Sequence, residues 1–389
     1  MYPHQAERLE AARARLGVDA LVATSAANVA YVSGFRRLPR ACDRATGVLA
    51  VYTAGGTALV IPALDAPALA AGDAAADHVV CHGPFGLAVA EGADASARRA
   101  AALAREAAAS ADAALARALD ALGLTRGAVG LDDAMLPPAA ASALAARLKT
   151  FTLVPATEAL AEARQVKGPY EIECLQQSLH VAEESVHEVL GALEAGITER
   201  EAAALLERAL ARRRARPSST LIAFGPSTAL PTAAPGDRAL RPGDLVRIDV
   251  GCLFKGYHAE IARVAVLGEP AAPHAALHDA VDAGIDAALA AIRPGAPAGT
   301  VFEAVVAAVR GGGLAAFEPL HAGHGIGLEA AESPWLAPGG GPLEAGTVLV
   351  VEAAHHELGA VGVQVKETVL VNQAGAAVMN RANRGLVVL

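Results

Sequence analysis

The sequence predicts an α/β protein built from two domains. In residues 1–156, short runs of branched aliphatic residues alternate with alanine-rich helical segments, a pattern typical of an α/β domain. In residues 157–389, longer apolar strands, tight turns and long helices indicate an α+β domain. The chain has 389 residues, 53% of them apolar, which is ample for two large cores. We therefore place the domain boundary between residues 156 and 157.

The elements of the first domain follow from local periodicity. An amphipathic helix opens the chain, and residues 88–122 are also expected to be helical, because alanine is the best helix former and their apolar spacing persists. Strands are expected at residues 17–25, 47–52, 57–62, 128–132 and 152–155, with a helix over 136–148.

The second domain is predicted to begin with a long helix over residues 169–195. Thr198 and Glu201 form a capping box that starts the next helix. Further helices are expected over residues 274–292 and 301–309. Strands are expected over residues 348–352 and 362–371.

The net charge, the absence of targeting signals and the cysteine spacing argue against nucleic-acid-binding, membrane and secreted proteins. The net charge is -9, which argues against nucleic acid or an anionic membrane as partner. No run of 18 apolar residues lacks a charge or glycine, and the N-terminus has no apolar signal-peptide core. The four cysteines have no CxxC spacing, so we expect reduced packing residues. These features predict a cytoplasmic protein.

The stretch from Arg247 to Arg263 organises the second domain. An apolar run carries Asp249, a turn follows at Lys255-Gly256, and a second run carries Glu260 at its start. This pattern predicts a β-hairpin with two acids facing each other across its strands. The alternative is that both acids are solvated residues at a strand edge.

Three further segments follow in order along the chain. His324 lies between glycines in an Ala-Gly-His-Gly-Ile-Gly-Leu run, where missing side chains allow a close approach of the backbone. A buried-type strand ends on Glu352, and another strand carries Lys366 and Glu367 in its middle.

In this order, the hairpin, the glycine-flanked histidine and the two charged strands resemble the creatinase, aminopeptidase P, prolidase and methionine aminopeptidase family. The run Asn28–Phe35 and the segment from Arg164 to Ile172 are similar to the same family. The resemblance implies a creatinase-type N-terminal α/β domain followed by a pita-bread α+β catalytic domain.

The resemblance also implies positions for two metal ions. The family's Asp, Asp, His, Glu and Glu ligands correspond to Asp249, Glu260, His324, Glu352 and Lys366. An ammonium has no lone pair and repels a cation, so Lys366 cannot take the place of a bridging carboxylate. The neighbouring Glu367 does not replace it, because adjacent strand residues point to opposite faces.

Two more positions depart from the family pattern. Thr232 and Ala331 stand where the metallopeptidases carry histidines. We therefore expect an enzyme without a cofactor. A single divalent metal ion on Glu260, His324 and Glu352 is the alternative, and a two-metal site is the least supported.

The sequence thus predicts a metal-independent, creatinase-like hydrolase acting on a carbon-nitrogen bond of a small amino-acid-like or amidino substrate. Glu260 and Glu352 are expected to exchange protons, and His324 to orient or protonate the leaving group. Asp249 and Lys366 are expected to set the electrostatics. The alternative is that Lys366 forms a buried ion pair that only supports the fold.

Substrate contacts are expected from Arg40 and Arg44, which lie in an arginine-rich loop over residues 36–44 and have forked donors suited to a carboxylate. In creatinase-like relatives this loop serves the neighbouring subunit, so the resemblance implies a homodimer with each N-terminal domain near the partner's active site. A solvated basic loop is the alternative. The other substrate-binding candidates are Thr232, His258, Gln364 and His356.

Two other functions stay open at this point. A catalytically inactive pita-bread protein would use the fold as a binding scaffold. A mononuclear Xaa-Pro-type metallopeptidase would cleave proline peptides. Elimination or ring closure on the same acid-base residues also stays open.

Overall fold

The computed structural model describes residues 2–37, 47–72, 74 and 76–389. The chain divides into two compact units, Met1–Arg164 and Gln165–Leu389. The predicted domain boundary, between residues 156 and 157, falls at the start of helix α7 (Thr157–Gln165) and stays a prediction. Within the described ranges, every helix is too short or too polar to cross a membrane.

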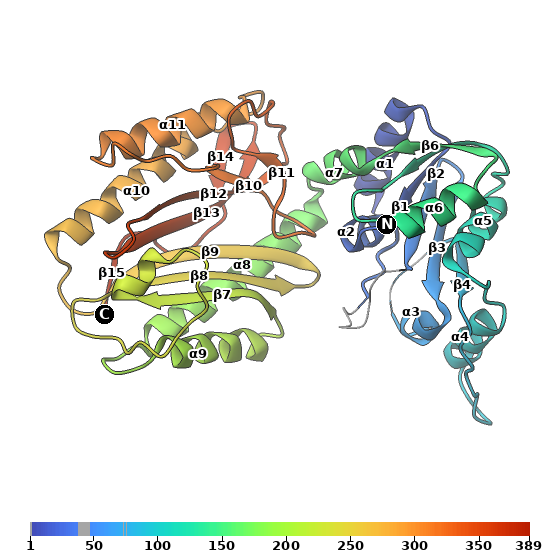
Figure 1. The fold of residues 1–389 in the computed structure, drawn as a ribbon, viewed down its shortest axis with the longest axis horizontal. Coiled ribbons are helices and arrows are strands. Elements are labelled where there is room, and N and C mark those ends of the chain that lie inside the picture. The colour runs from blue at the N-terminus through green and yellow to red at the C-terminus, as the bar shows by residue number, and fades with distance from the viewer. Residues whose placement is uncertain (1, 38–46, 73, 75) are drawn as a thin grey trace. The chain divides into compact units, whose positions relative to one another are not determined.

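The first unit is built on one six-stranded mixed sheet, drawn from blue to green in Figure 1. Its strands, in spatial order, are β4 (His78–His82), β3 (Gly56–Pro62), β2 (Leu49–Thr53), β1 (Ala20–Ala23), β5 (Gly127–Leu131) and β6 (Phe151–Pro155). Its other helices are α1 (Pro3–Leu16), α2 (Ala26–Ser33), α3 (Ala66–Ala70), α4 (Ala95–Arg105), α5 (Ala111–Ala121) and α6 (Pro138–Arg147). Strand β4 has no counterpart among the sequence predictions.

The single helix expected over residues 88–122 is wrong, because α4 and α5 are separate and residues 88–94 lie outside both. Asp94 accepts a hydrogen bond from the Ala97 backbone N–H and so begins α4. Ser110, in an extended conformation, begins α5. Such side chains favour helix starts over helix interiors. The alanine-rich stretch is divided where α4 ends at Arg105 and α5 begins at Ala111.

The second unit contains two sheets with helices outside them. The four-stranded sheet has the order β15 (Val387–Val388), β9 (Tyr257–Val266), β8 (Leu245–Phe254) and β7 (Arg216–Phe224). The five-stranded sheet has the order β11 (Glu332–Trp335), β10 (Gly323–Gly325), β12 (Val348–His356), β13 (Gly362–Asn372) and β14 (Gly375–Val378). The helices are α8 (Pro169–Leu190), α9 (Glu199–Arg212), α10 (Ala272–Ala291) and α11 (Ala298–Gly311).

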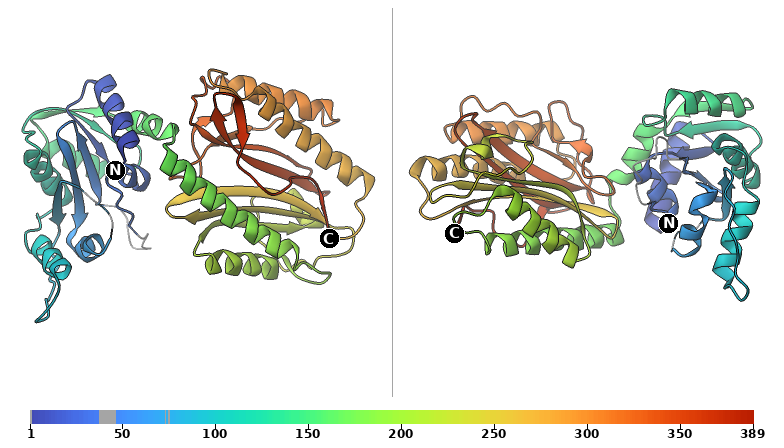
Figure 2. Two further views of the ribbon diagram at one scale, coloured as in Figure 1. Left: turned by 180° about the vertical axis from the view of Figure 1, so that it is seen from behind. Right: turned by 60° about the horizontal axis from the view of Figure 1, so that its bottom comes forward.

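Two hydrophobic cores hold these layers together. Helices α8 and α9 pack on the four-stranded sheet in one core, and α10 and α11 pack on the five-stranded sheet in the other. Strands β9 and β13 pack against each other, so the two sheets meet there, as both views in Figure 2 also show. The predicted capping box is confirmed, since Thr198 and Glu201 bond reciprocally at the start of α9.

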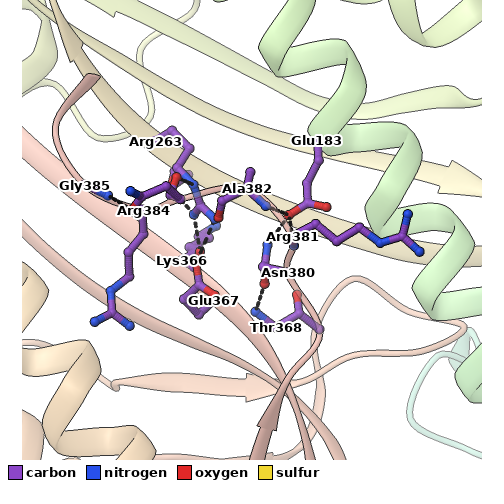
Figure 3. A network of polar contacts seen from close by, with 12 residues as sticks. Glu183, Arg263, Lys366, Glu367, Thr368, Asn380, Arg381, Ala382, Arg384 and Gly385 are labelled. Carbon is purple, nitrogen blue, oxygen red and sulfur yellow. Dashed lines mark hydrogen bonds and ion pairs between the residues drawn. The ribbon is translucent and has the colours of Figure 1, made fainter. Parts of the chain in front are cut away.

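Arg263, on β9, links this strand to β13 and to the C-terminal segment of the chain (Figure 3). Its guanidinium donates to the Lys366 carbonyl oxygen at 2.7 Å and to Glu367 Oε1 at 2.7 Å. The same group donates to the Ala382 and Asn383 carbonyls of the C-terminal segment. Glu367 therefore faces away from the side chain of Lys366, as strand alternation predicts. This network fixes the backbone that carries Lys366.

Glu367 is expected to give stability a pH dependence. Burial raises its pKa to about 6 from an ordinary value of 4.5, against the opposing attraction of Arg263 and Arg384. Its contribution to stability is therefore complete below pH 4.5 and is lost as the pH rises through 6, a change of roughly 2 kcal/mol. Urea unfolding should show that the wild type loses this amount relative to Glu367→Gln between pH 4.5 and pH 7. A parallel pH profile for the two proteins would contradict the assignment. The exposed Glu207→Gln serves as control.

Candidate active site

The hairpin of β8 and β9 brings the first two acids to one place. Lys255 and Gly256 both have left-handed φ values, 51° and 81°, which suit the tight turn of a hairpin. Asp249 pairs with Ala262, and Glu260 pairs with Gly251. The prediction that the two acids face each other is therefore wrong in register, because they are diagonal neighbours. Both still reach the same cation, Lys366.

Lys366 lies at the centre of a cluster of carboxylates. Its Nζ is 3.0 Å from Asp249 Oδ1, 2.9 Å from Glu260 Oε2 and 3.7 Å from Glu352 Oε2. Strands β12 and β13 place Glu352 directly opposite Lys366. With His324, these residues form what we call the acid-base cluster: Asp249, Glu260, His324, Glu352 and Lys366.

Burial and mutual attraction set the charge state of this cluster. Burial would lower the pKa of Lys366, but the attraction of Asp249, Glu260 and Glu352 outweighs it and raises that pKa. The Lys366 side chain therefore stays an ammonium. Burial raises the pKa of Asp249, with Lys366 opposing and the two glutamates adding to the rise. Asp249 therefore holds a proton more readily than an ordinary aspartate does.

Glycines let strand β10 carry His324 into the cluster. A Cβ on Gly323 would lie 2.1 Å from the Val350 carbonyl oxygen, so only glycine fits there. His324 Nδ1 is 3.0 Å from the Gly325 carbonyl oxygen, and an imidazole nitrogen bonded to a carbonyl carries the proton. Its Nε2 lies 3.8 Å from Glu260 Oε2.

His321 is a site residue that the sequence reasoning missed. Its Nδ1 lies 3.1 Å from Glu352 Oε1, and its ring meets the His324 ring edge-on at 5.8 Å between centroids. Trp335 from β11 contacts both rings. Burial lowers the pKa of His321, although Glu352 opposes this effect. The only signal in the sequence was its place three residues before His324.

Gln364 and Arg247 lie beside the acid-base cluster, each on the same strand face as one of its members. Gln364 lies two residues before Lys366 on β13, and its Oε1 accepts a hydrogen bond from Arg247 at 3.0 Å. Arg247 lies two residues before Asp249 on β8 and also donates to the Leu230 and Pro231 carbonyls. The sequence reasoning assigned no role to Arg247.

Three other predicted contacts lie outside the acid-base cluster. Thr232 is in an exposed turn and bonds to none of the cluster's side chains in the described part of the chain. His356 Nδ1 lies 3.3 Å from the Thr228 carbonyl, and burial lowers its pKa. Burial also lowers the pKa of His258, which Glu260 attracts without bonding to it.

The predicted arginines of the N-terminal loop, Arg40 and Arg44, lie outside the described residues. Arg37, at the start of that loop, forms an ion pair of 2.7 Å with the buried Asp65 in the first unit. The role of Arg40 and Arg44 in substrate binding therefore stays a prediction.

The side chains present do not fit the pair of metal ions that the resemblance implies. An ammonium donates to two of the expected ligands and has no lone pair to offer a metal. In the part of the chain that the structure describes, no three or more His, Cys, Asp or Glu side chains are arranged to hold a metal ion.

Sequence models of two families match almost the whole chain. The model of the Creatinase/Prolidase N-terminal domain matches residues 5–166. The model of Metallopeptidase family M24 matches residues 173–373, about half of the chain.

Individual relatives agree with these matches. The chain is 27% identical to an uncharacterized peptidase of Staphylococcus aureus over 219 residues, which are 56% of this chain and 62% of that protein. It is 28% identical to the Xaa-Pro dipeptidase of Pyrococcus furiosus over 232 residues, 59% of this chain and 67% of that protein. The solved Xaa-Pro dipeptidase of Bacillus anthracis has the same fold, with a TM-score of 0.82, 20% identity and 99% of each chain covered. The chain spans about three fifths of the length of the Staphylococcus aureus relative.

The expectation of an enzyme without a cofactor is wrong, because the matching family is one of metallopeptidases. The ammonium of Lys366 is therefore a departure of this chain from its family. It does not show that the enzyme works without a metal ion.

The predicted fold is confirmed, with a creatinase-type N-terminal domain and a pita-bread catalytic domain. The chain belongs to metallopeptidase family M24.

Proposed function

We propose that this protein is a prolidase-like hydrolase that cleaves a carbon-nitrogen bond in a small amino-acid-like substrate. The observation that carries the proposal is the gathering of three carboxylates around Lys366 Nζ at 2.9–3.7 Å, with His321 and His324 at their edge. Groups this close exchange protons readily. An inactive binding protein has no need for such a set, which supports an enzyme.

The geometry supports separate roles for the two glutamates. Glu352, beside His321, accepts a proton from the water whose oxygen bonds to the carbonyl carbon. Glu260, beside His324, supplies a proton to the nitrogen that leaves as the carbon-nitrogen bond breaks. Lys366 and Asp249 balance the charge around them. After product release Glu352 carries the extra proton and Glu260 lacks one, and the starting state returns when Glu352 loses its proton to solvent and Glu260 takes one up from solvent.

A second candidate is a mononuclear Xaa-Pro metallopeptidase, which membership of a metallopeptidase family favours. Its ligands would be Glu260, His324 and Glu352, and two of these now lie 2.9 Å and 3.7 Å from the Lys366 ammonium.

A substrate panel tests both candidates. Purified protein is assayed against Ala-Pro, a matched dipeptide without proline, and creatine, with and without manganese, cobalt, zinc or a chelator. We expect cleavage of Ala-Pro or creatine. Loss of cleavage with chelator and its return with metal would establish the metallopeptidase. Absence of turnover on the whole panel in every condition would contradict the proposed hydrolase and favour a binding protein.

We also propose a cytoplasmic homodimer in which Arg40 and Arg44 contact the substrate in the partner's site. The buried thiol of Cys81, whose pKa burial raises to about 11, agrees with a reducing compartment. Light scattering on the full chain tests the dimer, and a monomer at assay concentration would contradict it.

A further inference from the structure

We infer that Arg247 and Gln364 form a subsite that binds the substrate's carboxylate group next to the acid-base cluster. The inference rests on the proposed function for the claim that the ligand is a small amino-acid-like molecule. It assigns the ligand's charged group to side chains of the catalytic domain itself.

The strand register places this subsite beside the reacting groups. Arg247 precedes Asp249 by two residues on β8, and Gln364 precedes Lys366 by two residues on β13. Residues two apart on a strand share a face and lie roughly 6.5 Å apart along it. Arg247 and Gln364 therefore form a row one pleat away from Asp249 and Lys366. A dipeptide-sized molecule spans that distance.

Arg247 is a buried cation that hydrogen-bonds to no described carboxylate, although Asp249 and Glu199 attract it from further away. Its residue is 0% exposed, yet its three acceptors are the neutral oxygens of Leu230, Pro231 and Gln364. Its Nε has no hydrogen-bond partner in the described structure. A buried charge without a directly bonded counter-charge is costly. A ligand carboxylate would supply that bonded counter-charge.

The segment whose carbonyls accept hydrogen bonds from Arg247 is exposed and weakly held. Leu230 is 44% exposed, and residues 231–234 are also exposed and belong to no helix or strand. Across residues 231–235 of the described structure, the one backbone hydrogen bond is that of the Pro231 carbonyl with Arg247. Segments with so few bonds open at low cost. A carboxylate can therefore take the place of the two carbonyls at Arg247.

The chemistry of the two side chains suits a carboxylate. The guanidinium offers parallel donors in a rigid fork that matches the two carboxylate oxygens. The amide nitrogen of Gln364 forms no hydrogen bond with a described residue, and it adds a neutral donor beside the fork. A primary amide in place of the carboxylate would bring no charge and so would bind more weakly.

Calorimetry with a matched pair of probes tests the subsite without requiring turnover. N-acetyl-L-proline and N-acetyl-L-proline amide differ only in the carboxylate. We expect the wild type to bind the acid roughly 10- to 100-fold more tightly than the amide, as charge-assisted bidentate pairing predicts. Arg247→Met should abolish this preference, and Arg247→Lys should restore it only in part.

Arg238→Met is the matched control. Arg238 fastens the same loop through the Phe224 carbonyl and an ion pair with Asp244, away from Arg247. It should keep the preference for the acid, provided thermal melting shows that each variant is folded. An equal affinity of the wild type for both probes, a preference that survives in Arg247→Met, or an equal loss in Arg238→Met would overturn the inference. The Ala-Pro and creatine assay tests the proposed hydrolase activity independently of this binding measurement. A protein that is inactive but prefers the acid in an Arg247-dependent way would contradict only the proposed function.

Discussion

Glu352→Gln is expected to lower kcat/KM for the hydrolysed substrate by about 10²- to 10⁴-fold, the usual loss when a positioned acid or base is removed. The amide keeps the size of the carboxyl group but cannot accept a proton from water. It still reaches the His321 ring, which now lies 3.1 Å from Glu352 Oε1. Steady-state kinetics on the substrate identified by the panel, together with thermal melting, measure the effect.

Glu357→Gln is the control for this change, because Glu357 is an exposed acid just beyond β12. It should leave both kcat and KM within about twofold of the wild type, as expected for a surface position. If both variants keep full activity, Glu352 is not the base and the proposed roles are wrong.

Lys366→Met is expected to lower the free energy of unfolding by about 3–5 kcal/mol, the usual result of removing one partner from a buried ion pair. The substitution leaves Asp249, Glu260 and Glu352 together in a buried place without a cation. Their mutual repulsion and the loss of two hydrogen bonds act in the same direction. Urea unfolding at pH 7.5 measures the change.

Lys149→Met is the control, since Lys149 is exposed. Its effect should stay within about 0.5 kcal/mol. A Lys366→Met protein as stable as the wild type would mean that the ammonium does not balance the carboxylates.

Lys366→Glu extends the test to metal binding. A carboxylate there adds a ligand and removes a repelling charge, so calorimetry should show divalent manganese binding at least about tenfold more tightly than in Lys366→Met, which only removes the charge. Equal affinities in the two variants would show that position 366 does not contact the metal.

Much of the fold could be predicted from local patterns. The turn at Lys255-Gly256 and the apolar runs around it predict β8 and β9, and the Thr198 capping box predicts the start of α9. These features depend on interactions within a few residues. The alanine-rich stretch misled the prediction because its composition favours helix throughout, whereas α4 ends at Arg105 and α5 begins only at Ala111.

The members of the acid-base cluster could also be named from the sequence, because the order of four segments resembles a known family, and the family's ligand positions correspond to these residues. Strand periodicity correctly turned Glu367 away from Lys366, toward Arg263. It did not give the register of the hairpin, since alternation states which face a residue occupies and not which residue lies opposite.

By itself, then, the sequence determined the two-domain α/β class, the family resemblance and the five residues of the acid-base cluster. Only the tertiary structure decided that His321 contacts Glu352 and that the buried Arg247 bonds to Gln364. The physical reason is that these contacts join segments more than thirty residues apart in the chain. Their distances depend on how strands and loops pack, which no local periodicity encodes.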